Sequence, residues 1–156
     1  MTAKKQDSRE KMIQSMFNTV NGKKIAFLGW AFKKNTNDTR ESAAIYVADH
    51  LLKEQAQISV FHWEVQEHQI YNDLGYFNTS SDQENKELLK IMDNPYKACQ
   101  DAHGIAILTE WDEFKYYDWK RIKDNMKKPA FIFDGRKLLD RKKIESLGFV
   151  YYAIGE

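Results

Sequence analysis

Two positively charged segments, each directly after a predicted strand, have the residue types that bind anions. Residues 29–39 contain Lys33 and Lys34, and Arg40 follows at the start of a predicted helix. Unpaired N–H groups and the positive dipole end of a helix favour a phosphate or another anion. In the second segment, Asp134-Gly135-Arg136, glycine permits a sharp turn and the guanidinium suits bidentate phosphate or carboxylate recognition. Together they predict an anion-binding crevice for a nucleotide or phosphate.

The charges alone leave structural explanations open. The first segment could be an ordinary solvated loop, with Arg40 paired to a surface carboxylate. Asp134 could hold Arg136 in a purely structural pair. A third loop, Thr109 to Trp111, follows another predicted strand, and Trp111 could plug the end of the sheet.

The elements that would position these loops alternate between strand and helix. Short apolar runs predict strands at 24–29, 57–61, 105–108, 130–133 and 149–154. Apolar periodicity predicts helices ending near Val20 and at 41–55, 65–74, 83–92, 95–102, 118–126 and 140–147. This order predicts an α/β fold, a Rossmann-like three-layer αβα sandwich with a mostly parallel sheet of about five or six strands. Ligands in such folds bind beyond the carboxyl ends of the strands.

Composition narrows the class of protein. The chain has 156 residues, a length typical of one domain, and 24 basic against 23 acidic residues. This near balance argues against a nucleic-acid or membrane surface built on bulk charge. One cysteine excludes a disulfide framework, and the four histidines show no metal-ligand spacing, so we expect no metal site. With no secretory signal and no apolar stretch long enough to cross a bilayer, we expect a cytoplasmic domain.

Four motifs in register resemble one known family. The stretch GWAFKKNTNDTRES, from Gly29 to Ser42, is similar to the G-x-A-F-K-x-x-T-x-D-x-R-x-S signature of the UDP-glucose/GDP-mannose dehydrogenase family. Three more matches follow in order: NPYKACQDAHGIAILTEWDEF, PAFIFDGRKLLD and FVYYAIG. The resemblance covers about residues 9–156 and is more specific than any single short pattern.

The resemblance implies a domain organisation and an activity. Residues 1–22 would be the end of the family's inter-domain helix, and 23–156 its C-terminal UDP-sugar-binding domain. The family oxidises UDP-glucose to UDP-glucuronate in two NAD-dependent steps, through a thiol-bound intermediate on a cysteine. The implied partners are UDP-glucose or another UDP-sugar, an N-terminal dehydrogenase domain, and further copies of the chain.

The resemblance also implies site residues. Phe32 and Lys33 match family positions that contact the UDP-sugar, and Arg136 matches the arginine of the family's FDGR motif, which engages the same ligand. Arg40 matches the arginine that reaches NAD bound to the other domain. These positions coincide with the loops from which an anion-binding crevice is predicted.

The chain departs from the family pattern in several places. It contains neither the G-x-G-x-x-G cofactor motif nor the catalytic GG-S-C-F-x-K-D segment, so we expect substrate binding without turnover. Cys99 lies outside that segment in a predicted helix, where a structural role is expected. His62-Trp63-Glu64 replaces the family's Tyr-Asp-Pro, and Asn35 and Asn37 replace the Asp and Gly common in the first loop.

Two other functions stay open at the level of sequence. A non-catalytic assembly module would keep the fold for subunit contacts and use its aromatic residues, Tyr76, Phe77, Tyr116, Tyr117 and Trp119, at an interface. A flavodoxin-like or Rossmann domain for a different phosphorylated ligand would prefer adenine over uracil nucleotides.

Overall fold

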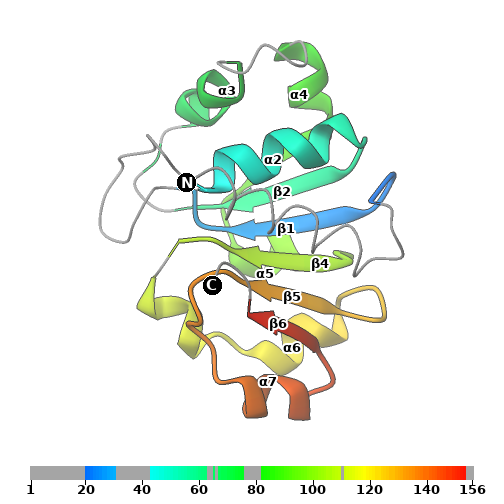
Figure 1. The fold of residues 1–156 in the computed structure, drawn as a ribbon, viewed down its shortest axis with the longest axis vertical. Coiled ribbons are helices and arrows are strands. Elements are labelled where there is room, and N and C mark those ends of the chain that lie inside the picture. The colour runs from blue at the N-terminus through cyan, green and yellow to red at the C-terminus, as the bar shows by residue number, and fades with distance from the viewer. Residues whose placement is uncertain are drawn as a thin grey trace.

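Six parallel strands form a single sheet. The computed structural model describes residues 20–30, 43–62, 65, 67–75, 82–109 and 111–153. The strands are β1 (Lys24–Leu28), β2 (Gln57–Phe61), β3 (Leu89–Met92), β4 (Gly104–Ile107), β5 (Phe131–Asp134) and β6 (Val150–Ala153). Their order in the sheet is β3-β2-β1-β4-β5-β6, and every adjacent pair is parallel (Figure 1). The predicted α/β fold class is confirmed.

Helices connect the strands and cover both faces of the sheet. They are α2 (Ala43–Lys53), α3 (Glu67–Gly75), α4 (Asp82–Leu88), α5 (Pro95–Cys99), the 3-10 helix η1 (Asp112–Tyr116), α6 (Trp119–Asp124) and α7 (Arg141–Ser146). Helices α2 and α3 pack on one face, and α5, α6 and α7 on the other. The predicted three-layer arrangement is therefore present.

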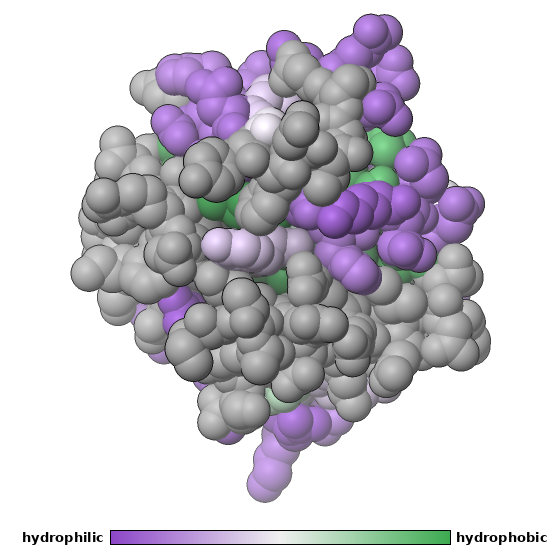
Figure 2. All heavy atoms as spheres, turned by 45° about the horizontal axis from the view of Figure 1, so that its top comes forward, coloured by the Kyte–Doolittle hydropathy of each residue, from purple (hydrophilic) through white to green (hydrophobic). Residues whose placement is uncertain are grey.

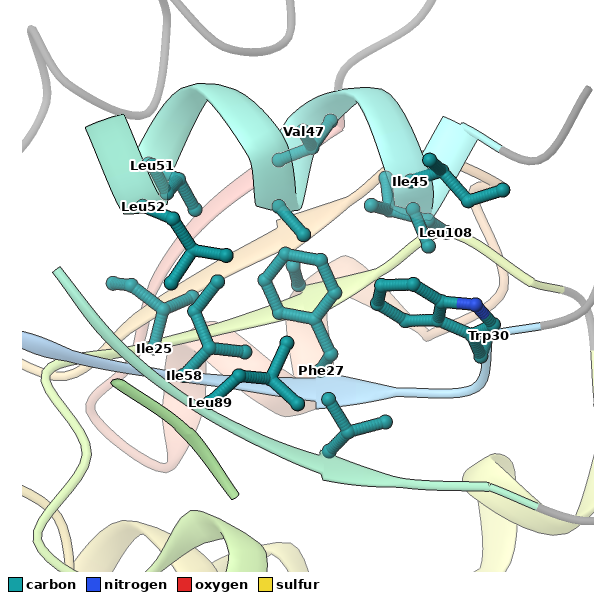
Figure 3. Close-up of a cluster of buried hydrophobic side chains, with 14 of the residues drawn as sticks. Ile25, Phe27, Trp30, Ile45, Val47, Leu51, Leu52, Ile58, Leu89 and Leu108 are labelled. Carbon is teal, nitrogen blue, oxygen red and sulfur yellow. The ribbon is translucent and has the colours of Figure 1, made fainter. Parts of the chain in front are cut away.

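Side chains of β1 alternate between two separate cores, as strand geometry requires. Ile25 and Phe27 join the core under α2, whereas Ala26 and Leu28 join the core under α5 and α6. Figure 3 shows the first of these cores, where α2 lies across Phe27 and the buried ring of Trp30. Because helices cover both faces of the sheet, the strand sequences are continuous apolar runs rather than alternations of apolar and polar residues.

The prediction of a helix over 83–92 is wrong in its second half. Helix α4 ends at Leu88 and the chain continues directly as β3, whose residues pair with Ile58 to Phe61 of β2. The apolar residues of this stretch satisfy both a helical and a strand pattern. Pairing with the exposed edge of β2 decides the outcome, because it satisfies backbone groups that no local helix reaches.

Capping side chains and a proline, residue types that are typical of helix starts, mark where α5 and α6 begin. Asn94 accepts hydrogen bonds from the backbone N–H groups of Tyr96 and Lys97, and Pro95 occupies the first turn of α5. Asp118 accepts from the N–H of Arg121 and caps α6. The predicted helix before Val20 and the start of the predicted 41–55 helix lie outside the described residues.

The surface seen in Figure 2 is predominantly hydrophilic where the structure describes it, with small apolar areas between polar side chains. In the described part of the chain, no helix combines the length and the apolar character needed to cross a membrane.

Candidate functional site

The carboxyl ends of β1, β4 and β5 lie next to one another at one edge of the sheet. Leu28 is in register with Ile107, and Ile107 with Asp134. The residues that follow are tied to the neighbouring strands, since Gly29 donates its N–H to Phe61 O at 2.7 Å and Gly135 to Ile107 O at 2.8 Å. Strand order reverses between β1 and β4, so a ligand crevice is expected at this point. All three predicted ligand loops start at this edge, after β1, β4 and β5.

Gly29 lets β1 and β4 approach closely at the switch point. Its φ is +93°, and a Cβ at this position would lie 2.8 Å from Thr109 Cβ and 3.6 Å from Phe114 Cζ. Thr109 is fully buried. Glycine is therefore required both by the backbone conformation and by the space.

The segment that opens the first anion-binding loop is anchored to α3. Trp30 follows Gly29, is fully buried, and donates its indole N–H to Asp73 Oδ2 at 3.1 Å. Gln69 donates to the other carboxylate oxygen of Asp73 at 2.8 Å. These bonds fix the chain at the point where it leaves β1.

A buried carboxylate holds the loop that carries Arg136. Asp134 is fully buried. Its Oδ1 accepts from the backbone N–H of Arg136 at 3.0 Å, while its Oδ2 accepts from the backbone N–H of Leu139 and from the Tyr151 hydroxyl, each at 2.8 Å. Burial, and then the bond to Asp134, raise the pKa of Tyr151 above its ordinary value. The Asp134 carboxylate thus holds both ends of the turn 134–139 through hydrogen bonds.

The Arg136 side chain is exposed at the carboxyl edge of the sheet. The pairing of Asp134 with Arg136 that the sequence left open is present through the backbone N–H of Arg136. Asp134 is therefore a structural residue that sets the path of the turn, and the turn places the Arg136 side chain outside the core. A guanidinium in this position can donate hydrogen bonds to a phosphate or carboxylate that binds from solvent.

Three of the four candidate binding residues cannot be placed. Phe32, Lys33 and Arg40 lie in the segment 31–42, outside the described residues. The predicted convergence of Lys33 and Arg136 on one anion therefore stays a prediction. Trp30 before this segment and Ala44 after it are both fully buried in the first core.

Two other candidates belong to the core. Trp111 is 5% exposed and packs in the second core, as expected for a side chain that plugs the sheet end. Cys99 is 1% exposed in α5, and burial raises the pKa of its thiol to about 12. A thiol of this kind is a poor nucleophile, and the expected structural role of Cys99 fits this environment.

Neither a metal centre nor a dinucleotide cradle is built from the residues that can be placed. Among the described side chains, no group of three His, Cys, Asp or Glu could hold a metal ion. The turn after β1 lacks the glycines that let backbone approach a pyrophosphate, and the large Trp30 occupies its second position.

Sequence reasoning missed two residues that shape the site. Asp73 and Tyr151 act on the loops from other elements, and Asp73 lies 43 residues from Trp30 along the chain. No local spacing signals such contacts. Only the strand order, with β6 beside β5, would have brought Tyr151 to Asp134.

This parallel sheet, with loops gathered where its strand order reverses, defines a nucleotide-binding class of α/β domain. The family model for the UDP-glucose/GDP-mannose dehydrogenase family, UDP binding domain, matches residues 26–141. The chain belongs to this family, and the matched part is its UDP-binding domain.

Curated relatives agree with this assignment. UDP-glucose 6-dehydrogenase 1 of Arabidopsis thaliana is 47% identical over 156 residues, covering 94% of this chain and 32% of the relative. The UDP-glucose 6-dehydrogenase of Caenorhabditis elegans is 48% identical over 146 residues, covering 94% and 30%. The chain thus spans about a third of the length of these relatives.

Solved structures share the fold. The NDP-N-acetyl-D-galactosaminuronic acid dehydrogenase of Methanosarcina mazei Go1 has a TM-score of 0.72 at 22% identity, covering 99% of this chain and 29% of that one. A UDP-glucose dehydrogenase of Pyrobaculum islandicum has a TM-score of 0.64 at 19% identity, covering 94% and 30%.

Proposed function

We propose that this chain binds the substrate of a cytoplasmic, NAD-dependent UDP-glucose 6-dehydrogenase, which converts UDP-glucose to UDP-glucuronate in two oxidation steps. Residues 23–156 would form the UDP-sugar-binding domain, and residues 1–22 the end of an inter-domain helix. The identity of nearly half over almost the whole chain to UDP-glucose 6-dehydrogenases supports this substrate. The domain alone would bind UDP-glucose and leave it unchanged.

The observation that carries the proposal is the position of Arg136. The Asp134 carboxylate holds the turn through two backbone N–H groups, and the exposed Arg136 side chain extends from it at the carboxyl edge. There the guanidinium would engage the UDP-sugar in bidentate fashion. Lys33 would supply the second cation and Phe32 an apolar contact.

The oxidation chemistry would reside outside this domain. NAD supplies a hydride acceptor, and its main binding residues would belong to an N-terminal dehydrogenase domain, to which Arg40 would reach. The chain's one cysteine, Cys99, is buried with a raised pKa, so the thiol nucleophile of the reaction would also come from that domain. Further copies of the chain would complete a homo-oligomer.

Titration of the chain with UDP-glucose in a calorimeter tests substrate binding. We expect saturable binding at millimolar or lower concentration, and a loss of about tenfold in affinity in Arg136→Ala, since one charge-assisted contact contributes roughly 1.5 kcal/mol. Lys120→Ala is the matched control, because it removes one positive charge from an exposed position on α6.

The outcomes separate the candidate functions. Weaker binding in Arg136→Ala with an unchanged oligomeric state supports the substrate-binding function. A folded protein that shows no heat with UDP-glucose would contradict it and favour an assembly module. An Arg136→Ala variant that binds UDP-glucose as wild type does would contradict the role of Arg136. Preference for ADP over UDP would point instead to a different phosphorylated ligand.

A further inference from the structure

A second concave site lies between η1, α6 and α7, and is lined in part by Leu138 and Leu139 of the turn that carries Arg136. It has a volume of about 430 Å³, in the range of small-molecule sites. Its lining combines apolar and charged side chains: Lys115, Trp119, Leu138, Leu139, Asp140, Lys143 and Ile144. We call it the α6–α7 groove.

The floor of the α6–α7 groove is apolar and held rigidly. Trp119 and Ile144 are 2% and 1% exposed. The Trp119 indole N–H donates to Phe114 O at 2.9 Å, so the ring is fixed and its polar atom is already satisfied. The Leu139 backbone is held by the Asp134 carboxylate. Such a surface accepts an aromatic or aliphatic body without reorganisation.

The rim of the groove is cationic. Lys115 and Lys143 are exposed. Lys115 forms a long ion pair of 3.7 Å with Asp112, in which the two side chains are 46% and 60% exposed. A solvent-exposed pair of this kind adds little stability, so Lys115 can turn to a ligand at small cost. Among the lining residues that the structure describes, Asp140 is the one carboxylate, and it caps α7 through the backbone N–H of Lys142.

We propose that the α6–α7 groove binds a small anionic amphiphile, that is, an aromatic or aliphatic body that carries one carboxylate or sulfonate. The body would lie on Leu138 and Leu139, beside the edge of the buried Trp119 ring, and the acid group would lie between Lys115 and Lys143. Charge complementarity selects this class, because two lysines face one engaged carboxylate. The size of the groove favours a small molecule over a folded partner.

The probe for this site is 8-anilinonaphthalene-1-sulfonate, which has the proposed chemistry. We expect saturable fluorescence enhancement with the folded chain. Each of Lys115→Ala and Lys143→Ala should weaken binding about threefold to fivefold, as expected for partly exposed charges, and the double variant about tenfold. Lys90→Ala is the matched control, since Lys90 is an exposed lysine on β3, at the opposite edge of the sheet from β6.

Amide and indole resonances of the labelled chain locate the probe. Shifts confined to Trp119, Leu138 and Leu139, with competition by octanoate, support the proposal. Shifts elsewhere, or fluorescence that both lysine variants leave unchanged, would overturn it. A groove that binds only peptides, or that is covered by self-association of the chain, would overturn it as well. UDP-glucose titration of the same variants distinguishes this site from the substrate site, because loss at the α6–α7 groove should leave UDP-glucose affinity intact.

Discussion

Tyr151 of β6 donates a 2.8 Å hydrogen bond to the fully buried carboxylate of Asp134 on the neighbouring strand β5. The same carboxylate accepts the backbone N–H groups of Arg136 and Leu139. The Asp134 side chain thus both links β5 to β6 and sets the position of Arg136, the candidate binding residue.

Asp134→Asn should destabilise the fold and weaken UDP-glucose binding. The amide replaces one acceptor oxygen with a donor that faces N–H or O–H donors, so we expect the free energy of unfolding to fall by about 2–4 kcal/mol. Tyr151→Phe removes one of the three bonds and should cost only about 1–2 kcal/mol, with the turn and the ligand affinity preserved. Urea denaturation measures both, and equal losses in the two variants would contradict this division.

Gly29→Ala should be strongly destabilising. The new Cβ would meet Thr109 Cβ at 2.8 Å and the backbone would be strained at φ +93°, so we expect a loss of about 2–4 kcal/mol in unfolding free energy. Gly22→Ala is the matched control, because Gly22 also has a positive φ of +73° but nothing lies within 4 Å of its Cβ position. That variant should lose only about 1 kcal/mol. Thermal denaturation compares the two, and similar losses would argue against a close approach at the switch point.

Cys99 should be unreactive in the folded protein. With its pKa raised to about 12 and 1% exposure, the thiol is almost entirely protonated and shielded near neutral pH. A disulfide reagent added at about pH 8 should label the folded chain at least 100-fold more slowly than the chain unfolded in guanidinium chloride. Rapid labelling of the native chain would show that the burial of α5 is described wrongly.

Stability should fall on mild acidification, partly through His103. Burial, with Lys23 and Lys127 nearby, lowers the pKa of His103, whose Nδ1 accepts the backbone N–H of Lys24 at 3.2 Å. Below the ordinary pKa of 6.5 the unfolded chain binds a proton that the folded chain resists, so the free energy of unfolding decreases as pH falls. The pKa of His62 is lowered as well and contributes with the same sign.

His103→Gln isolates this contribution. Between about pH 7 and about pH 5 the variant should lose less stability than wild type, measured by urea denaturation at each pH. Parallel pH profiles for the two proteins would show that His103 does not titrate differently in the folded state.

Much of the architecture could be predicted because the signals are local. The apolar run at 24–29 is buried on both faces. Asp118 starts α6 by accepting the N–H of Arg121 three positions on, and Pro95 starts α5 because its backbone angle suits a first helical turn. Residues 89–92 could not be assigned, since their strand forms by pairing with β2 rather than by local preference.

The candidate site, too, could be predicted from the sequence only where its signals are local. The loop with Arg136 was predicted from a glycine and a charge next to a strand, both visible in the sequence. Its supports, Asp73 for Trp30 and Tyr151 for Asp134, come from elements 43 and 17 residues away and required the fold. The 3-10 helix η1, which contributes Phe114 next to Gly29, was likewise not predicted.

The central claim is that a UDP-sugar binds where β1, β4 and β5 end. Amide resonances of the isotopically labelled chain, followed during titration with UDP-glucose, test it most directly. The account predicts that the largest shift changes fall on Gly29, Gly135 and Arg136, at the carboxyl edge of the sheet. Changes centred instead on Lys24 and His103, at the amino edge, would contradict it.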